Sequence, residues 1–175
     1  MKRILLIFIT VISANAFMFA QSHIRFLDIP LNGEFDTFKE NLEQKDIYKD
    51  SYGKYGFSGI FFGTIASVSV GYNEETLNVY SALVRYNQSM TNLSEDKIIA
   101  LYNRIRQGLI KKYPKVQTQS IDGQLLLILK NGYIYLRAFE APKVIGGITI
   151  ELEYVDKLNS PKYEIPKLKS IENDL

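Results

Sequence analysis

Two runs of predicted strands, separated by one long amphipathic helix, constrain the fold of this chain most strongly. Residues 66–72 alternate apolar side chains with Ser67, Ser69 and Gly71, the period of a strand with one buried face. A second strand is predicted at 77–86. Residues 94–113 then place apolar side chains on one helical face, with acidic residues in the first turn and Pro114 after the end. Strands grouped on both sides of a helix favour antiparallel α+β over parallel βαβ units.

The remaining segments complete this prediction. An extended segment at 24–31 precedes a helix whose Phe35, Phe38 and Leu42 share one face, and a glycine- and aromatic-rich loop enters a strand near Gly59. Three strands are predicted after the long helix, at 124–129, 133–139 and 148–155, with a hairpin at Asn131-Gly132. We therefore predict an α+β fold with two helices packed on a mainly antiparallel sheet of about six strands. The order also allows tandem helix-plus-three-strand units.

The N-terminus has the order of a secretory signal. Lys2 and Arg3 precede an apolar run at 4–12, and small residues follow. Cleavage after Ala16 and cleavage after Ala20 are both compatible with the sequence, and we favour Ala20. The predicted organisation is a signal peptide at 1–20, a single α+β domain at 21–156 and a loosely structured C-terminal tail at 157–175.

Cysteine usage and charge narrow the functional classes. The chain has no cysteine, which excludes a disulfide scaffold and a lipid-modified cysteine anchor. Removing Lys2 and Arg3 from the 21 basic residues leaves 19 against 19 acidic ones, so we expect no nucleic-acid partner. The apolar run at 4–12 is too short for a membrane-spanning helix, and no second apolar run of that length follows it. We expect an exported, soluble product, periplasmic or extracellular, with no transmembrane anchor after signal cleavage.

No cofactor or catalytic motif stands out. The chain has no phosphate-binding loop of the GxxxxGK[ST] type and a single histidine, His23, so we predict no cofactor and no paired-histidine metal site. If cleavage follows Ala20, the sequence Gln21-Ser22-His23 could bind a square-planar Cu(II) or Ni(II) ion. The alternative that we favour is an ordinary surface histidine.

One pair of predicted strands carries the candidate binding face. Alternate residues of the strand at 133–139 share a face, and so do two carboxylates of the last strand: Tyr133, Tyr135, Arg137, Phe139, Glu151 and Glu153. If the two strands pair antiparallel, Arg137 can meet Glu151 or Glu153. We interpret this set first as a cross-strand ion pair on a solvated face. It could also form an aromatic and charged binding platform, or a catalytic carboxylate pair.

The sequence also resembles a group of small secreted bacterial proteins of unknown function. The run FLDIPLNG at 26–33 is similar to that group's lead into its first helix, although Asp28 stands where the group often has glycine. The Gly-Phe-rich strand at 57–63, the long strand at 79–86 and KKYP at 111–114 extend the resemblance from about Phe26 to Lys115. The group resembles β-lactamase inhibitor proteins in fold, which implies a sheet face used for protein contact and transfers no functional residue.

These observations predict an exported, non-enzymatic module that binds another envelope protein or a small ligand. The alternatives are a carboxylate-dependent periplasmic hydrolase acting on a glycan-type substrate, and a structural accessory of the envelope. The absence of a catalytic constellation and the aromatic-rich antiparallel sheet favour the binding module.

Overall fold

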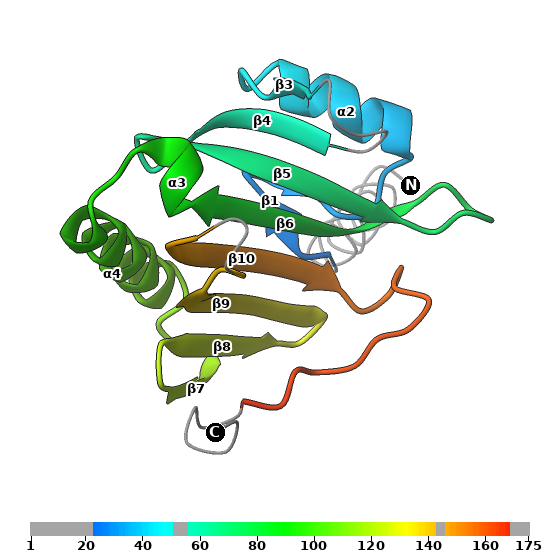
Figure 1. The fold of residues 1–175 in the computed structure, drawn as a ribbon. Helices are drawn as coiled ribbons and strands as arrows, with labels where there is room; N and C mark the ends of the chain where they lie inside the picture. Colours follow the sequence, from blue (N-terminus) through cyan, green and yellow to red (C-terminus); the bar gives the residue numbers. More distant parts are fainter. Residues whose placement is uncertain (1–22, 51–55, 143–145, 169–175) are drawn as a thin grey trace, which may run out of the picture.

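The computed structural model describes residues 23–50, 56–142 and 146–168. They form an α+β fold with an eight-stranded sheet and a separate two-stranded sheet (Figure 1). The described helices are α2 (Phe35–Glu43), α3 (Gln88–Thr91) and α4 (Glu95–Lys112). The strands are β1 (Arg25–Phe26), β2 (Ile29–Pro30), β3 (Tyr48–Lys49), β4 (Gly56–Phe61), β5 (Thr64–Tyr72), β6 (Val79–Asn87), β7 (Gln117–Ile121), β8 (Gln124–Leu129), β9 (Gly132–Glu140) and β10 (Ile148–Asp156).

The large sheet is antiparallel throughout and has the order β3-β4-β5-β6-β10-β9-β8-β7. Consecutive strands are neighbours within β3–β6 and within β7–β10. Two meanders therefore meet where β6 lies against β10, although α4 and three strands separate them in the chain. This central pairing brings distant residues into one row across the sheet.

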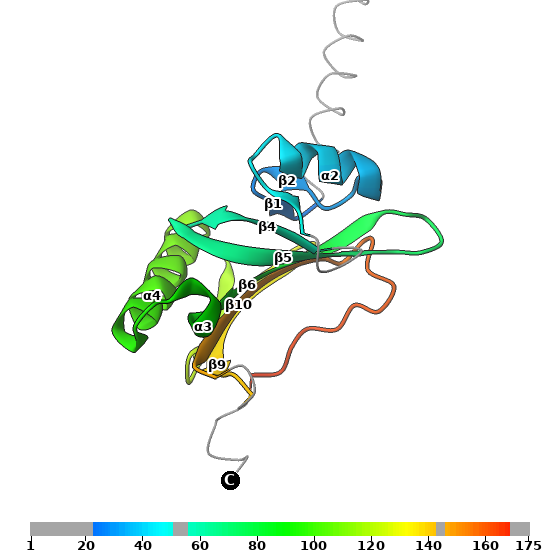
Figure 2. The ribbon, with the colours of Figure 1, turned by 45° about the horizontal axis from the view of Figure 1, so that its top comes forward.

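One face of the large sheet carries the main core. Phe38 of α2 and Ile98 and Ile105 of α4 belong to the same buried cluster as Val84 of β6 and Leu152 of β10. Both helices therefore pack on this face, and α2 lies above the sheet in Figure 2. We call the opposite side the open face. It carries the alternate residues of the central strands and is crossed by the segment that follows β10, which lies below the sheet in Figure 2.

The predicted class is confirmed, but the predicted numbers of elements are wrong. There are three described helices instead of two, and eight strands plus a two-stranded sheet instead of about six. The missed β1, β2 and β3 have two residues each, too few to show a period. All five residues of β7 are exposed, so this edge strand has no apolar pattern. The single-turn α3 depends on Asn87, whose side chain accepts a hydrogen bond from the Ser89 amide.

The long predicted helix is confirmed as α4. Its four buried residues follow the predicted face: Ile98, Leu101, Ile105 and Leu109. Glu95 and Asp96 lie in the first turn and two lysines in the last, as the helix dipole favours. Ser94 occupies the N-cap position, but its side chain makes no capping hydrogen bond. Burial of one apolar face and placement of charge at the ends therefore define this helix.

The hairpin predicted at Asn131-Gly132 is also confirmed, since β8 and β9 pair directly across it. Gly132 has φ +153°, and a Cβ at this position would overlap the carbonyl oxygen of Val155 on β10. The glycine thus permits both the backbone conformation and the close approach of the neighbouring strand.

Residues 157–168 contain turns but no helix or strand. The Asn159 side-chain amide donates to the carbonyl oxygen of Leu31 at 2.8 Å, which fastens the start of the segment. Farther along, the Tyr163 ring centroid lies 5.9 Å from that of Tyr133, and Leu168 packs against a small cluster on the open face. The rest of the predicted tail, 169–175, and the predicted signal peptide at 1–20 lie outside the described residues.

Candidate functional site

Strand register places three charged side chains in one row on the open face. Glu151 of β10 lies opposite Arg137 of β9 on one side and opposite Arg85 of β6 on the other. Side chains directly across antiparallel strands point to the same face, so the two arginines flank the carboxylate. Arg137 is the partner that the sequence analysis proposed for Glu151 or Glu153, and the register gives it to Glu151.

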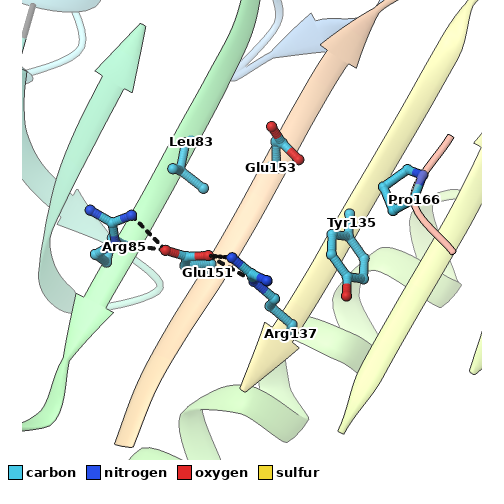
Figure 3. Close-up of a pocket in the computed structure, with 7 residues that line it drawn as sticks. All are labelled: Leu83, Arg85, Tyr135, Arg137, Glu151, Glu153 and Pro166. Carbon is cyan, nitrogen blue, oxygen red and sulfur yellow. Dashed lines mark hydrogen bonds and ion pairs between the residues drawn. The ribbon is translucent and has the colours of Figure 1, made fainter. Parts of the chain in front are cut away.

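The row forms a doubly forked ion pair (Figure 3). Arg85 donates from Nε (2.8 Å) and Nη2 (2.6 Å) to Oε1 of Glu151. Arg137 donates from Nε (2.8 Å) and Nη2 (2.5 Å) to Oε2. The Glu151 side chain is 7% exposed, whereas each arginine side chain is 46% exposed. A buried carboxylate thus holds two half-exposed guanidinium groups in fixed orientations.

Aromatic rings fix Arg137 further. Its guanidinium carbon lies 4.9 Å from the ring centroid of Phe139 and 5.8 Å from that of Tyr135. These residues are two positions away on either side in β9, so they share its face. Cation–π contacts with these two rings restrict the Arg137 guanidinium. Its Nη1 group takes no part in the hydrogen bonds to Glu151.

A second row lies one pleat farther along the strands. Glu153 is opposite Tyr135 of β9 and Leu83 of β6, and the Tyr133 hydroxyl donates to Glu153 Oε2 at 3.3 Å. Burial raises the pKa of Glu153 above its ordinary value of 4.5. The Tyr133 hydrogen bond and the charge of Arg137 lower this pKa in part, and the Glu151 charge raises it. Burial also raises the pKa of Tyr133, and Glu153 adds to that increase.

The two rows line a cleft of about 200 Å³. Its walls come from β6, β9, β10 and the C-terminal segment: Leu83, Arg85, Tyr135, Arg137, Glu151, Glu153 and Pro166 (Figure 3). A second cleft of about 490 Å³ reaches Met90 of α3 and shares Arg85 with the first. Arg85 therefore joins two adjacent depressions on the open face.

The chemistry of the site favours binding over catalysis. Four N–H donors occupy both oxygens of Glu151, so this carboxylate is engaged as an acceptor and is not free to act as a nucleophile or base. The Nη1 groups of Arg85 and Arg137 take no part in the hydrogen bonds to Glu151. They can donate to a carboxylate or phosphate oxygen of a ligand. Within 23–50, 56–142 and 146–168, no cluster of three acidic or histidine side chains could hold a metal ion.

The structure brings the six residues of the predicted face onto the open face. Glu151, Glu153, Tyr135 and Arg137 line the cleft, while Phe139 stacks on Arg137 and Tyr133 bonds Glu153. Sequence reasoning missed Arg85. Its alternation with buried Val84 and Tyr86 places it on a solvent-facing side of its strand. Its partner Glu151 is 66 residues away, and no local pattern identifies that strand pairing.

His23 is not an isolated surface residue. Its Nδ1 atom lies 3.2 Å from Oδ2 of Asp156, which is fully buried and also accepts from the Ile24 amide at 2.9 Å. The other Asp156 oxygen accepts from the amides of Leu158 and Asn159. Gln21 and Ser22, the other parts of the hypothetical metal site, lie outside the described residues. In the described chain His23 helps to join the first strands to the end of β10.

Comparison with known protein families, with characterised proteins and with solved structures finds no match for this chain. None of the described helices is both long and apolar enough to cross a membrane. The proposals below therefore depend on the geometry of the open face.

Proposed function

We propose that this chain is an exported, non-enzymatic binding module that holds an acidic ligand group at the row Arg85–Glu151–Arg137. The observation that carries the proposal is the pair of half-exposed guanidinium groups fixed by one buried carboxylate. Preorganised donors lose little freedom when a ligand arrives, so they bind more strongly than free surface arginines. The ligand is a carboxylate-bearing peptide segment of an envelope protein, or a small carboxylate.

The surroundings of the row support a peptide ligand. Phe139 and Tyr135 flank Arg137 and offer apolar area with a polar tip beside the charged donors. Such a mixture of aromatic rings and arginine is typical of the centre of protein interfaces. The two adjacent clefts share Arg85; the first is lined by β6, β9 and β10, the second by β4, β5, β6 and α3, and together they give room for an extended segment across these strands.

Export and fold ancestry belong to the same proposal. The basic, apolar and small-residue order of residues 1–20 supports a secretory signal and a soluble periplasmic or extracellular product. The two meanders that join at β6 and β10 support the interpretation as tandem helix-plus-strand units. The resemblance to small secreted proteins with a β-lactamase-inhibitor-like fold remains a prediction.

A carboxylate-dependent hydrolase is the second candidate, because Glu153 has a raised pKa inside the cleft. A glycosidase requires a second carboxyl group that is free to act as nucleophile or base. The neighbouring carboxylate, Glu151, already accepts four hydrogen bonds. The substitution Glu153→Gln separates the candidates: a hydrolase loses turnover of its glycan substrate, and a binding module keeps its ligand. A structural accessory would bind no acidic probe.

The decisive experiment is an NMR titration of the wild-type chain with glutarate, phosphate and an acetylated peptide that ends in a free carboxylate. We expect shifts of the Nε–Hε signals of Arg85 and Arg137, and binding at least about tenfold weaker in Arg137→Ala. The matched control is Arg104→Ala, because Arg104 is an exposed arginine on α4 that only donates to the Phe62 carbonyl. Equal binding by both variants, or no shift with any probe, overturns the proposal.

A further inference from the structure

The C-terminal segment lies on the half of the open face that β8, β9 and β10 build. Leu126, Tyr133 and Val155 form a small buried cluster on this side, and Tyr163 and Leu168 of the segment pack against it. The half built by β4, β5 and β6 presents serines and leaves the side chains of Ile60 and Ile65 largely exposed, at 72% and 67%. The segment therefore covers the small apolar cluster of β8, β9 and β10 and leaves the apolar residues of the other half exposed.

The contacts of the segment are those of an extended peptide ligand. Tyr163, Pro166 and Leu168 are half-buried, while the residues between them are exposed: Glu164, Ile165 and Lys167. The Tyr163 ring packs at a tilt against Tyr133, Pro166 lines the arginine cleft, and Leu168 packs against the cluster that contains Leu126. Three side chains thus enter the face at positions 163, 166 and 168 while the backbone only connects them.

The segment is firmly attached at one end and weakly attached along its length. Asp156 and Asn159 fasten its start through hydrogen bonds to the Leu158 amide and the Leu31 carbonyl. Residues 160–168 make no hydrogen bond to another described residue. Contacts made only by a few side chains are readily exchanged for equivalent contacts from another chain.

The segment also leaves the strongest donors unused. Glu164 makes no ion pair with a described residue, and the Nη1 groups of Arg85 and Arg137 take no part in the hydrogen bonds to Glu151, in the cleft that Pro166 also lines. A competing segment whose carboxylate points toward the arginines, unlike the exposed Glu164, can make the apolar contacts of the tail and also bind the arginines. The added contact with the arginines, which the tail does not make, would let such a ligand displace the tail.

We propose that residues 160–168 are an internal ligand of the open face, and that the partner is an extended peptide with aromatic, proline and leucine side chains in the same spacing plus a carboxylate. The inference rests on the function proposed above and names the partner of that face. Because the tail is tethered to the sheet, its effective concentration at the open face is high. A partner must therefore bind the face more tightly than the tail does in order to displace it.

The test uses the full chain and a fluorescent peptide with the sequence of residues 161–168, PKYEIPKL. The double variant Tyr163→Ser and Leu168→Ser removes two apolar contacts of the tail and substitutes no residue of the sheet, so we expect it to release the tail. A tail that occupies the face nine-tenths of the time weakens peptide binding about tenfold, so the variant is expected to bind about tenfold more tightly than wild type. A peptide with the same residues in scrambled order is the control. Equal affinity for wild type and variant, or equal binding of the scrambled peptide, overturns the inference.

A second measurement avoids any dependence on the variant. Fluorine-labelled Tyr163 in the wild-type chain gives a fluorine NMR signal for the docked tail. Excess PKYEIPKL peptide is expected to move this signal to the chemical shift of a released tail. A second peptide with glutamate in place of the lysine corresponding to Lys167 is expected to displace the tail at lower concentration. The variant Arg137→Ala removes this advantage and leaves binding of PKYEIPKL itself, which distinguishes a failure of the arginine site from a failure of the tail inference. An unchanged Tyr163 signal with both peptides contradicts the inference.

Discussion

The substitution Glu151→Gln tests whether the buried carboxylate holds the open face together. Glutamine keeps the length of the side chain but offers one acceptor oxygen, and its NH₂ group opposes the guanidinium on that side. One of the two forks, to Arg85 or to Arg137, is therefore lost. Because glutamine is neutral, Arg85 and Arg137 also lose the negative charge that separates their two positive charges.

The expected loss follows from the geometry of the pair. A hydrogen bond to a charged group contributes about 1.5–3 kcal/mol, and each fork contains two of them. Both arginine side chains are 46% exposed, so water replaces part of the lost interaction and screens the charges. We therefore expect unfolding free energy to fall by about 2 kcal/mol, which lowers Tm by about 4–8 °C for a chain of this length.

Urea unfolding followed by circular dichroism measures this loss, with an unchanged m-value as the sign that the native fold is kept. The matched control is Glu43→Gln on α2, since Glu43 and Lys39 form an exposed pair at 3.9 Å that should contribute less than about 0.5 kcal/mol. A loss for Glu151→Gln no larger than that of the control would refute the reasoning. In a double-mutant cycle, the effects of Glu151→Gln and Arg137→Gln should also be less than additive.

Three further substitutions test buried polar groups. Tyr86→Phe should raise the unfolding free energy by about 1 kcal/mol, because the buried Tyr86 hydroxyl has no hydrogen-bond partner among the described residues; a clear loss in urea unfolding contradicts this. Asp156→Ala should lower it by about 3 kcal/mol, since three backbone amides lose their acceptor in a fully buried position, and a loss within about 0.5 kcal/mol contradicts the assigned role. Burial raises the pKa of Glu153, so the folded chain binds this proton more tightly than the unfolded chain. The resulting stabilisation is complete below the ordinary value of 4.5 and is lost as pH rises through the raised pKa. Glu153→Gln should therefore gain Tm relative to wild type between about pH 4 and pH 7, and a pH-independent difference disproves the assignment.

The elements that the sequence predicted correctly have strong local signals. Burial of one helical face identifies α4, and the Asn131-Gly132 dipeptide identifies the turn between β8 and β9. The elements that it missed lack such signals. The exposed edge strand β7 gains its hydrogen bonds only from β8, and two-residue strands form because a neighbouring strand is already present.

The candidate site divides in the same way. Alternation in β9 and β10 places Tyr135, Arg137, Glu151 and Glu153 on one face, and this requires only the period of a strand. The contribution of Arg85 depends on the pairing of β6 with β10, and the contribution of Pro166 depends on the path of the C-terminal segment. Both depend on long-range packing.

By itself, the sequence determined the class of the fold, the long helix, the hairpin between β8 and β9 and which residues of β9 and β10 share the open face. These follow from side-chain periodicity and turn chemistry, which act between neighbours in the chain. Only the tertiary structure decided that β6 and β10 meet, that Glu151 holds two arginines instead of one, and that His23 bonds to Asp156. Those contacts join residues that are 14 to 133 positions apart. They can form, and stabilise the fold, only after burial of the common core has brought the strands together.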